Sequence, residues 1–263
     1  MKKFLTALFL CLFSLTALAA NPDFNKIFQN TSGCFILYDV SQKTIIKEYN
    51  PKRCNERITP ASTFKIPLSL MAFEQDLITQ KTVFTWDGVN KGLPQWNQNQ
   101  TPASWLKNSV VWVSQKLTPQ LGLRKIEYYL IKFRYGNQDF SGDPYKHNGL
   151  THAWLDSSLK ISAEEQFNFM RALVENTLPI TPDAAANTKQ NMFLETLPNG
   201  SKLYGKTGST SDTGWFIGYT QKTKPNYILI LNFTDLKPTQ NSVAAGTRAK
   251  TMVKNILSTM KLS

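Results

Sequence analysis

A serine and a lysine stand three residues apart in the stretch ITPASTFKIPLSL, at Ser62 and Lys65. The apolar run that begins here predicts a helix, and a helix places residues i and i+3 on one face, about one turn apart. The free backbone N–H groups of a helix opening favour negative charge. A serine in this place can lose its proton to a neighbour while N–H donors hold the resulting oxyanion, which is the chemistry of a covalent nucleophile.

A second group of residues gives the Ser62 pair a context. The spacing Ser-x-x-Lys alone is weak evidence, because it also begins at three other serines: Ser104, Ser157 and Ser258. The only Lys-Thr-Gly in the chain, Lys206 to Gly208, lies on a predicted strand. Its lysine and threonine can offer a cation and a hydroxyl to a carboxylate, and its glycine allows a close approach to the backbone. Taken alone, this motif could equally be the end of a surface strand.

The elements that must position these residues are strands at both ends of the chain and helices between them. Residues 33–49 predict a hairpin of two β-branched and aromatic strands, and KLYGKTG, GWFIGYTQ and NYILILNF predict three more. Residues 244–260 have the apolar spacing of a terminal helix. The simplest architecture is an α/β (α+β) fold, with one antiparallel sheet from both chain ends, flanking helices and an inserted helical region. A crevice between two such parts is where ligands tend to bind.

The middle of the chain predicts helices. TPASWLKNSVVWVSQKL has one apolar helical face, LRKIEYYLIKF has another, and SAEEQFNFMRALVEN opens with a capping box formed by Ser162 and Glu165. We therefore expect a mixed sheet and helix part over about 20–80 and 185–263, and a helical part over about 81–184.

The first twenty residues resemble an export signal. Lys2 and Lys3 precede an apolar run at 4–18 and a small-residue cleavage site, so we expect residues 1–19 to be removed and the protein to be periplasmic. The apolar run is short for a membrane span and none follows, so we expect no membrane anchor after cleavage.

Charge and cysteine content exclude some functions. The net charge of 30 − 18 = +12 is scattered along the chain, so we expect no nucleic-acid partner, although a positive field attracts small anions. His147 and His152 are expected in loop or packing positions, and two His with two Cys do not favour a metal centre. A hairpin turning near residue 42 sets Cys34 opposite residue 50, which favours unpaired thiols over a bond to Cys54, although a disulfide stays open.

The motifs together resemble a known family. Ser-x-x-Lys followed by Lys-Thr-Gly is the signature of the penicillin-recognising serine enzymes. Where class A members carry Ser-Asp-Asn, this chain has Ser109 followed by two valines. The chain is similar to class D β-lactamases, the oxacillinase type, over nearly the whole mature sequence. The stretches that carry the resemblance are PASTFK, WDGVNKGLPQWN, NSVVWVSQ, YGNQD, AWLDSSLKIS, YGKTG and GWFIGY.

The resemblance implies a particular base. In this family the lysine that corresponds to Lys65 takes up CO2 and acts as a carbamate, so CO2 or bicarbonate is the only cofactor expected. Because an ammonium cannot attack CO2, Lys65 needs an apolar site, which Phe64, Val111 and Trp154 can supply. The indole N–H of Trp154 can donate to the carbamate.

The resemblance also implies the remaining catalytic roles. Ser62 attacks the lactam carbonyl, and the backbone N–H groups of Ser62 and Ser209 form the oxyanion hole. Ser109 passes a proton to the departing nitrogen. Tyr135 of the YGN stretch is either a wall of the cleft or a participant.

Substrate binding is expected from a second set of residues. Val111 contributes an apolar contact, and Lys206, Thr207 and Gly208 orient the substrate carboxylate. Many family members add an arginine near the start of the final helix. Arg248 is the candidate here, but an alignment on KNIL leaves it possibly one residue out of register, so Thr207 and nearby hydroxyls are the alternative.

The resemblance therefore implies hydrolysis of β-lactams such as penicillins and oxacillin. The alternatives are a β-lactam sensor domain, which acylates without release, and a D,D-peptidase of the penicillin-binding proteins. The breadth of substrates and the oligomeric state are not indicated by the sequence.

Overall fold

The fold is organised around one sheet. The computed structural model describes residues 21–237 and 243–263, so the expected export signal lies outside the described residues. Six antiparallel strands follow the order β2-β1-β6-β5-β4-β3. Their bounds are β1 Thr31–Asp39, β2 Thr44–Tyr49, β3 Phe193–Thr196, β4 Lys202–Ser209, β5 Thr213–Gln221 and β6 Pro225–Asp235. The antiparallel sheet predicted from both chain ends is confirmed, and only the short edge strand β3 was not predicted.

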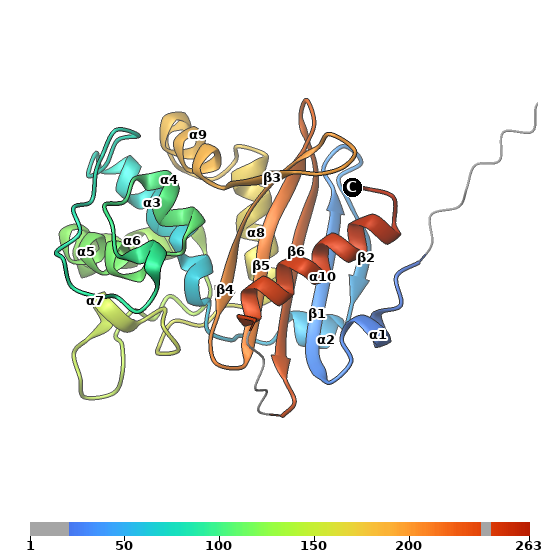
Figure 1. Cartoon of the computed structure of the whole chain (residues 1–263), viewed down its shortest axis with the longest axis horizontal. Helices are drawn as coiled ribbons and strands as arrows, with labels where there is room; N and C mark the ends of the chain where they lie inside the picture. The colour runs from blue at the N-terminus through green and yellow to red at the C-terminus, as the bar shows by residue number, and fades with distance from the viewer. Residues whose placement is uncertain (1–20, 238–242) are drawn as a thin grey trace, which may run out of the picture.

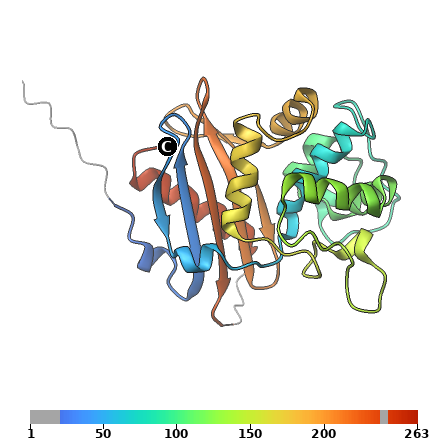
Figure 2. The same cartoon turned by 180° about the vertical axis from the view of Figure 1, so that it is seen from behind.

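Helices cover both faces of this sheet. Helix α10 (Ala245–Thr259) crosses one face in Figure 1, and α8 (Ala163–Val174) lies on the opposite face in Figure 2. The central strand β5 is buried along almost its whole length because of this double cover. The predicted capping box of α8 is confirmed, since Ser162 and Glu165 each bond the other's backbone N–H.

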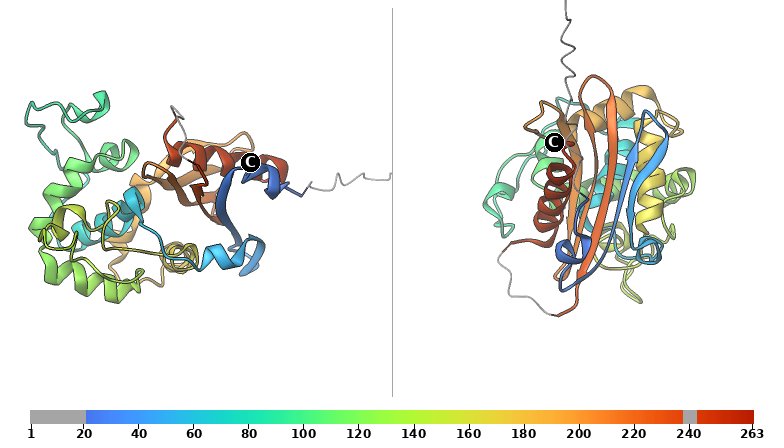
Figure 3. Two further views of the ribbon diagram at one scale, coloured as in Figure 1. Left: turned by 90° about the horizontal axis from the view of Figure 1, so that it is seen from below. Right: turned by 90° about the vertical axis from the view of Figure 1, so that its right-hand side faces the viewer.

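The remaining helices form a part that lies beside the sheet (Figure 3). Their bounds are α1 Phe24–Ile27, α2 Pro51–Cys54, η1 Ala61–Phe64, α3 Lys65–Glu74, η2 Pro94–Trp96, α4 Pro102–Lys107, α5 Val111–Leu121, α6 Leu123–Phe133, α7 Gly149–His152 and α9 Pro182–Asn191, of which α1 and α2 stay with the sheet. Helix α3 packs against α4, α5 and α9, whereas α8 packs on the sheet. Helix α3 thus packs with the helical part although its residues fall within 20–80, and α8 packs on the sheet although its residues fall within 81–184.

One predicted helix is divided. The apolar face of residues 101–117 suggested a continuous run, but α4 ends at Lys107 and α5 starts at Val111. Between them Ser109 takes a left-handed φ of 59°, which a helix cannot contain. The break lifts the Ser109 side chain out of the helical pattern.

The two cysteines are bonded, so the expectation of unpaired thiols is wrong. The hairpin has the predicted register, with Phe35 opposite Tyr49. Asn50 then takes a left-handed φ of 55°, and the single turn of α2 folds the chain back over the start of β1. This return brings the Cα atoms of Cys34 and Cys54 to 5.3 Å, and both side chains are fully buried. The hairpin argument failed because it stopped at the end of the second strand.

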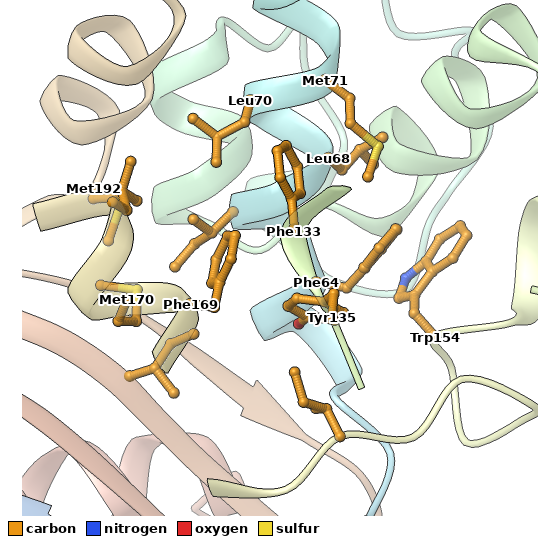
Figure 4. Packing of buried hydrophobic residues seen from close by; sticks show 14 of the residues in the cluster. Phe64, Leu68, Leu70, Met71, Phe133, Tyr135, Trp154, Phe169, Met170 and Met192 are labelled. Atoms are coloured by element: carbon orange, nitrogen blue, oxygen red, sulfur yellow. The ribbon is translucent and has the colours of Figure 1, made fainter. Parts of the chain in front are cut away.

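A hydrophobic core joins the sheet to the helical part (Figure 4). Around the start of α3, the Phe64 ring lies 5.4 Å from that of Trp154 and 6.1 Å from that of Tyr135, measured between centroids. A separate cluster fills the space between the sheet and α10. The next residue in the chain, Lys65, begins α3 and is itself fully buried.

Candidate active site

The nucleophile candidate sits in a tight turn that precedes a buried helix. Ser62 lies in η1, and Lys65 is the first residue of α3. The Lys65 Nζ atom is 3.0 Å from Ser62 Oγ, within hydrogen-bond distance. Ala61, directly before the serine, has a φ of 47°, a strained value for a non-glycine residue. The geometry required for proton transfer between these two side chains is present.

Burial controls the charge of Lys65. The side chain is fully excluded from solvent, and no carboxylate is hydrogen-bonded to it in the described ranges. Desolvation lowers the pKa of Lys65 well below its ordinary value, and the nearby charge of Lys206 lowers it further. This shift favours the neutral, nucleophilic form of the amine.

Trp154, which packs on Phe64, carries an unused hydrogen-bond donor. The Trp154 ring stacks on Phe64 at 5.4 Å and on Phe140 at 5.9 Å, and its carbonyl accepts a hydrogen bond from Thr59 Oγ1. The Trp154 Nε1–H is buried and has no hydrogen-bond partner among residues 21–237 and 243–263. A buried donor without a partner costs about 1–3 kcal/mol, a cost that an acceptor bonded to it would remove.

A second lysine and serine pair faces the site from the sheet. Lys206 on β4 is almost fully buried, and its Nζ donates to Ser109 Oγ at 3.0 Å and to the Thr207 carbonyl at 2.9 Å. Desolvation lowers the pKa of Lys206 to about 7. Because Ser109 occupies the break between α4 and α5, strand β4 and the helical part meet through this contact.

Strand β4 lies directly against the nucleophile turn. A Cβ atom at Gly208 would stand 2.9 Å from the Pro60 carbonyl oxygen and 3.2 Å from Thr63 Cγ2. Because Gly208 has no side chain, β4 can pack closely against this turn. The sequence had suggested only that this glycine gives a substrate access to the backbone. Ser209 follows at the exposed end of β4, and its Oγ accepts from the Gly246 N–H at 2.8 Å.

Arg248 already has a carboxylate partner. Its Nη1 and Nη2 atoms lie 3.0 Å and 2.5 Å from the two carboxylate oxygens of Asp235, and its guanidinium stacks over the Phe233 ring. Val111, by contrast, is the half-buried first residue of α5, two positions after Ser109. The structure thus brings Ser62 to Lys65 and Ser109 to Lys206, whereas it pairs Arg248 with Asp235.

Tyr135 is part of the core. It is fully buried, and burial raises the pKa of its hydroxyl. Its ring packs against those of Phe64 and Phe169, which is a packing position in the core. His147 and His152 are exposed, and in the described part of the chain no group of His, Cys, Asp or Glu could hold a metal ion.

The sequence reasoning missed two buried polar residues next to the turn, Thr63 and Gln166. They are hydrogen-bonded to each other at 2.9 Å, although they stand far apart in the chain. A polar Gln at an inward position of the amphipathic helix α8 was the only signal.

Comparisons with known proteins identify the family of this chain. A family model described as the penicillin binding protein transpeptidase domain matches residues 14–258. The chain is 46% identical to Beta-lactamase OXA-1 of Escherichia coli, over 90% of this chain and 88% of that protein. A solved class D β-lactamase from Bacillus subtilis superposes with a TM-score of 0.82 at 32% identity, covering 92% and 96% of the two chains. The C-terminal domain of the Bacillus licheniformis BlaR penicillin-receptor gives 0.82 at 31%, covering 93% and 97%.

The sheet, the buried lysine beside a serine and the Lys-Thr-Gly strand define a penicillin-recognising serine enzyme. Within that class, the chain belongs to the class D serine β-lactamases. The resemblance found in the sequence is confirmed.

Proposed function

We propose that the protein hydrolyses β-lactam antibiotics, penicillins and oxacillin-type compounds among them, through an acyl group carried on Ser62. The observation that supports this most directly is the fully buried Lys65, whose amine lies 3.0 Å from Ser62 Oγ. The relatives named β-lactamase support the substrate class.

The residues around Lys65 fit a bound carboxylate group derived from CO2. Burial favours the neutral amine, and the unpartnered Trp154 Nε1–H is a donor to which such a group could bond. When bound, the group supplies the general base for Ser62. Full burial of Lys65 excludes bulk water, which strengthens a hydrogen bond made there.

The other residues have separate tasks in the proposed reaction. Ser62 attacks the lactam carbonyl carbon, and the C–N bond of the ring breaks. The backbone N–H groups of Ser62 and Ser209 hold the oxygen that becomes negative. Ser109, hydrogen-bonded to Lys206, passes a proton to the leaving nitrogen. A pKa of about 7 lets Lys206 share its proton near neutral pH.

The substrate carboxylate binds at the end of β4 in this proposal. Thr207 is half-buried and Ser209 exposed, so both hydroxyls can reach a ligand, and Lys206 adds charge nearby. To bind the substrate carboxylate, Arg248 would first have to break its ion pair with Asp235, whose carboxylate is almost completely excluded from solvent. We therefore assign the carboxylate to the hydroxyls and Lys206.

We also propose export to the periplasm with removal of residues 1–19. The Cys34–Cys54 disulfide supports an oxidising compartment. No helix within 21–237 or 243–263 is long and apolar enough to cross a membrane.

Intact-protein mass spectrometry with oxacillin tests the proposal. The wild type should show a transient adduct on Ser62 and hydrolyse many equivalents of a chromogenic cephalosporin. Ser62→Ala should show neither, while Ser258→Ala, which alters another Ser-x-x-Lys, should behave as wild type. Ordinary turnover by Ser62→Ala would disprove the mechanism, and a single stoichiometric burst in the wild type would favour a sensor or a D,D-peptidase.

A further inference from the structure

A glutamine on the sheet side reaches the nucleophile turn through the core. Gln166 lies on α8, which packs against β1, β5 and β6. Its Nε2 atom donates to Thr63 Oγ1 at 2.9 Å and more weakly to Tyr135 Oη at 3.3 Å. All three side chains are fully buried. The contact joins the frame of the sheet to the residue that immediately follows Ser62.

The hydrogen bonds of Thr63 fix the direction of this contact. Its hydroxyl donates its single proton to the Pro60 carbonyl at 2.7 Å, and its backbone N–H bonds the same oxygen at 3.1 Å. The Thr63 oxygen can therefore only accept from Gln166. The amide NH2 group must face the turn, which a carboxylate or an apolar side chain of similar shape cannot reproduce.

The nucleophile turn is held from two sides. Gly208 on β4 packs against the Pro60 carbonyl oxygen and the Thr63 methyl group. Gln166 holds the same threonine from α8. Because Ser62 lies between Pro60 and Thr63, these contacts set where its hydroxyl stands relative to Lys65 and β4.

Stability alone does not account for the amide. The Gln166 Oε1 atom is buried and has no hydrogen-bond partner in the described ranges, and such an orphan is unfavourable. A methionine of similar length would remove this orphan and the need for a donor. The amide therefore gives the turn a hydrogen bond to Thr63 that an apolar side chain of similar size would not give.

We infer that Gln166 is a positioning residue for the nucleophile, acting through Thr63. The inference rests on the proposed role of Ser62. It predicts a loss in the acylation step with little change in noncovalent affinity, because Gln166 is buried in the core. A misplacement of about 1 Å at a reacting group can cost roughly 100-fold in rate.

Pre-steady-state acylation of Gln166→Met by a chromogenic cephalosporin tests this. We expect the acylation rate constant to fall about 10- to 100-fold, with a melting temperature within a few degrees of wild type. Noncovalent binding, measured in the Ser62→Ala background, should be unchanged. Thr188→Val is the matched control, because it removes a fully buried side-chain hydrogen bond, to Ser69 Oγ at 2.9 Å, that does not involve Thr63, and its acylation should stay near wild type.

A mutant cycle separates positioning from general destabilisation. Thr63→Val should show the same loss in acylation rate as Gln166→Met, whereas Thr63→Ser, which keeps the hydroxyl, should retain the wild-type rate. The double variant Thr63→Val with Gln166→Met should lose no more than either single variant. Wild-type acylation by Gln166→Met, or additive losses in the double variant, would overturn the inference. If Gln166→Met does not fold, equal rates for Thr63→Val and Thr63→Ser would overturn it. Activity of Ser62→Ala would instead refute the proposed function, so the two failures are distinguishable.

Discussion

Replacement of Trp154 by phenylalanine isolates the role of one hydrogen-bond donor. The variant keeps an aromatic ring against Phe64 and Phe140 and loses the Nε1–H, which has no partner within the described residues. Removal of a buried unpaired donor returns about 1–3 kcal/mol to the unmodified protein. The smaller ring leaves a cavity that costs about 1 kcal/mol. Because these effects oppose each other, we expect the melting temperature to change by only a few degrees.

The affinity for CO2 should change much more. A hydrogen bond to a charged group contributes about 1.5–3 kcal/mol. Since each 1.4 kcal/mol corresponds to a factor of about ten, Trp154→Phe should weaken retention of the carboxylate on Lys65 by roughly 10- to 150-fold. The rate at saturating bicarbonate should recover toward that of wild type, because Lys65 and Ser62 are untouched.

Initial rates measured over a series of bicarbonate concentrations provide the assay. The concentration that gives half of the maximal rate should rise by the predicted factor, and the carbamate signal in ¹³C NMR should fall in parallel at a fixed concentration. Trp105→Phe is the matched control, because this buried indole donates to Ser114 Oγ at 3.0 Å. That control should lower the melting temperature and leave the bicarbonate requirement unchanged. An unaltered bicarbonate requirement in Trp154→Phe would refute the reasoning.

Three further predictions follow from the described contacts. Cys34→Ala combined with Cys54→Ala removes a crosslink across 20 residues, so it should cost about 3 kcal/mol and about 6–12 °C in melting temperature; a melting curve that still responds to reductant in this variant would contradict the assignment. Activity should fall as the pH drops through the lowered pKa of Lys65, because only the neutral amine can hold the carboxylate, and added bicarbonate should shift the fall to lower pH; a profile that ignores bicarbonate would mean that the free amine is the base. Arg248→Ala should destabilise the fold by about 3 kcal/mol, because Asp235 loses its bidentate partner, and a raised KM without loss of stability would instead place Arg248 in substrate binding.

Much of the fold could be predicted because its patterns are local. Alternating and continuous apolar runs identified five of the six strands, and the Ser162–Glu165 capping box located the start of α8. The three-residue spacing of Ser62 and Lys65 was sufficient to bring their side chains together, because one turn of a helix fixes that separation.

Other features needed the tertiary structure because their partners are distant in the chain. The left-handed break at Ser109 interrupts an apolar pattern that reads as one helix, and Lys206 meets it from another part of the molecule. The return of the chain at Asn50 decided the disulfide. No periodicity indicates that Arg248 faces Asp235.

The sequence by itself thus determined the chemical groups and the family, since a nucleophile, a lysine and a Lys-Thr-Gly strand are legible in order along the chain. Tertiary packing decided the charge and the placement of these groups. Full burial lowers the pKa of Lys65 and so favours its neutral amine, and Gly208 and Gln166 hold the turn that carries Ser62. The physical reason is that desolvation and contact depend on every element that surrounds a residue, whereas spacing depends only on its neighbours in the chain.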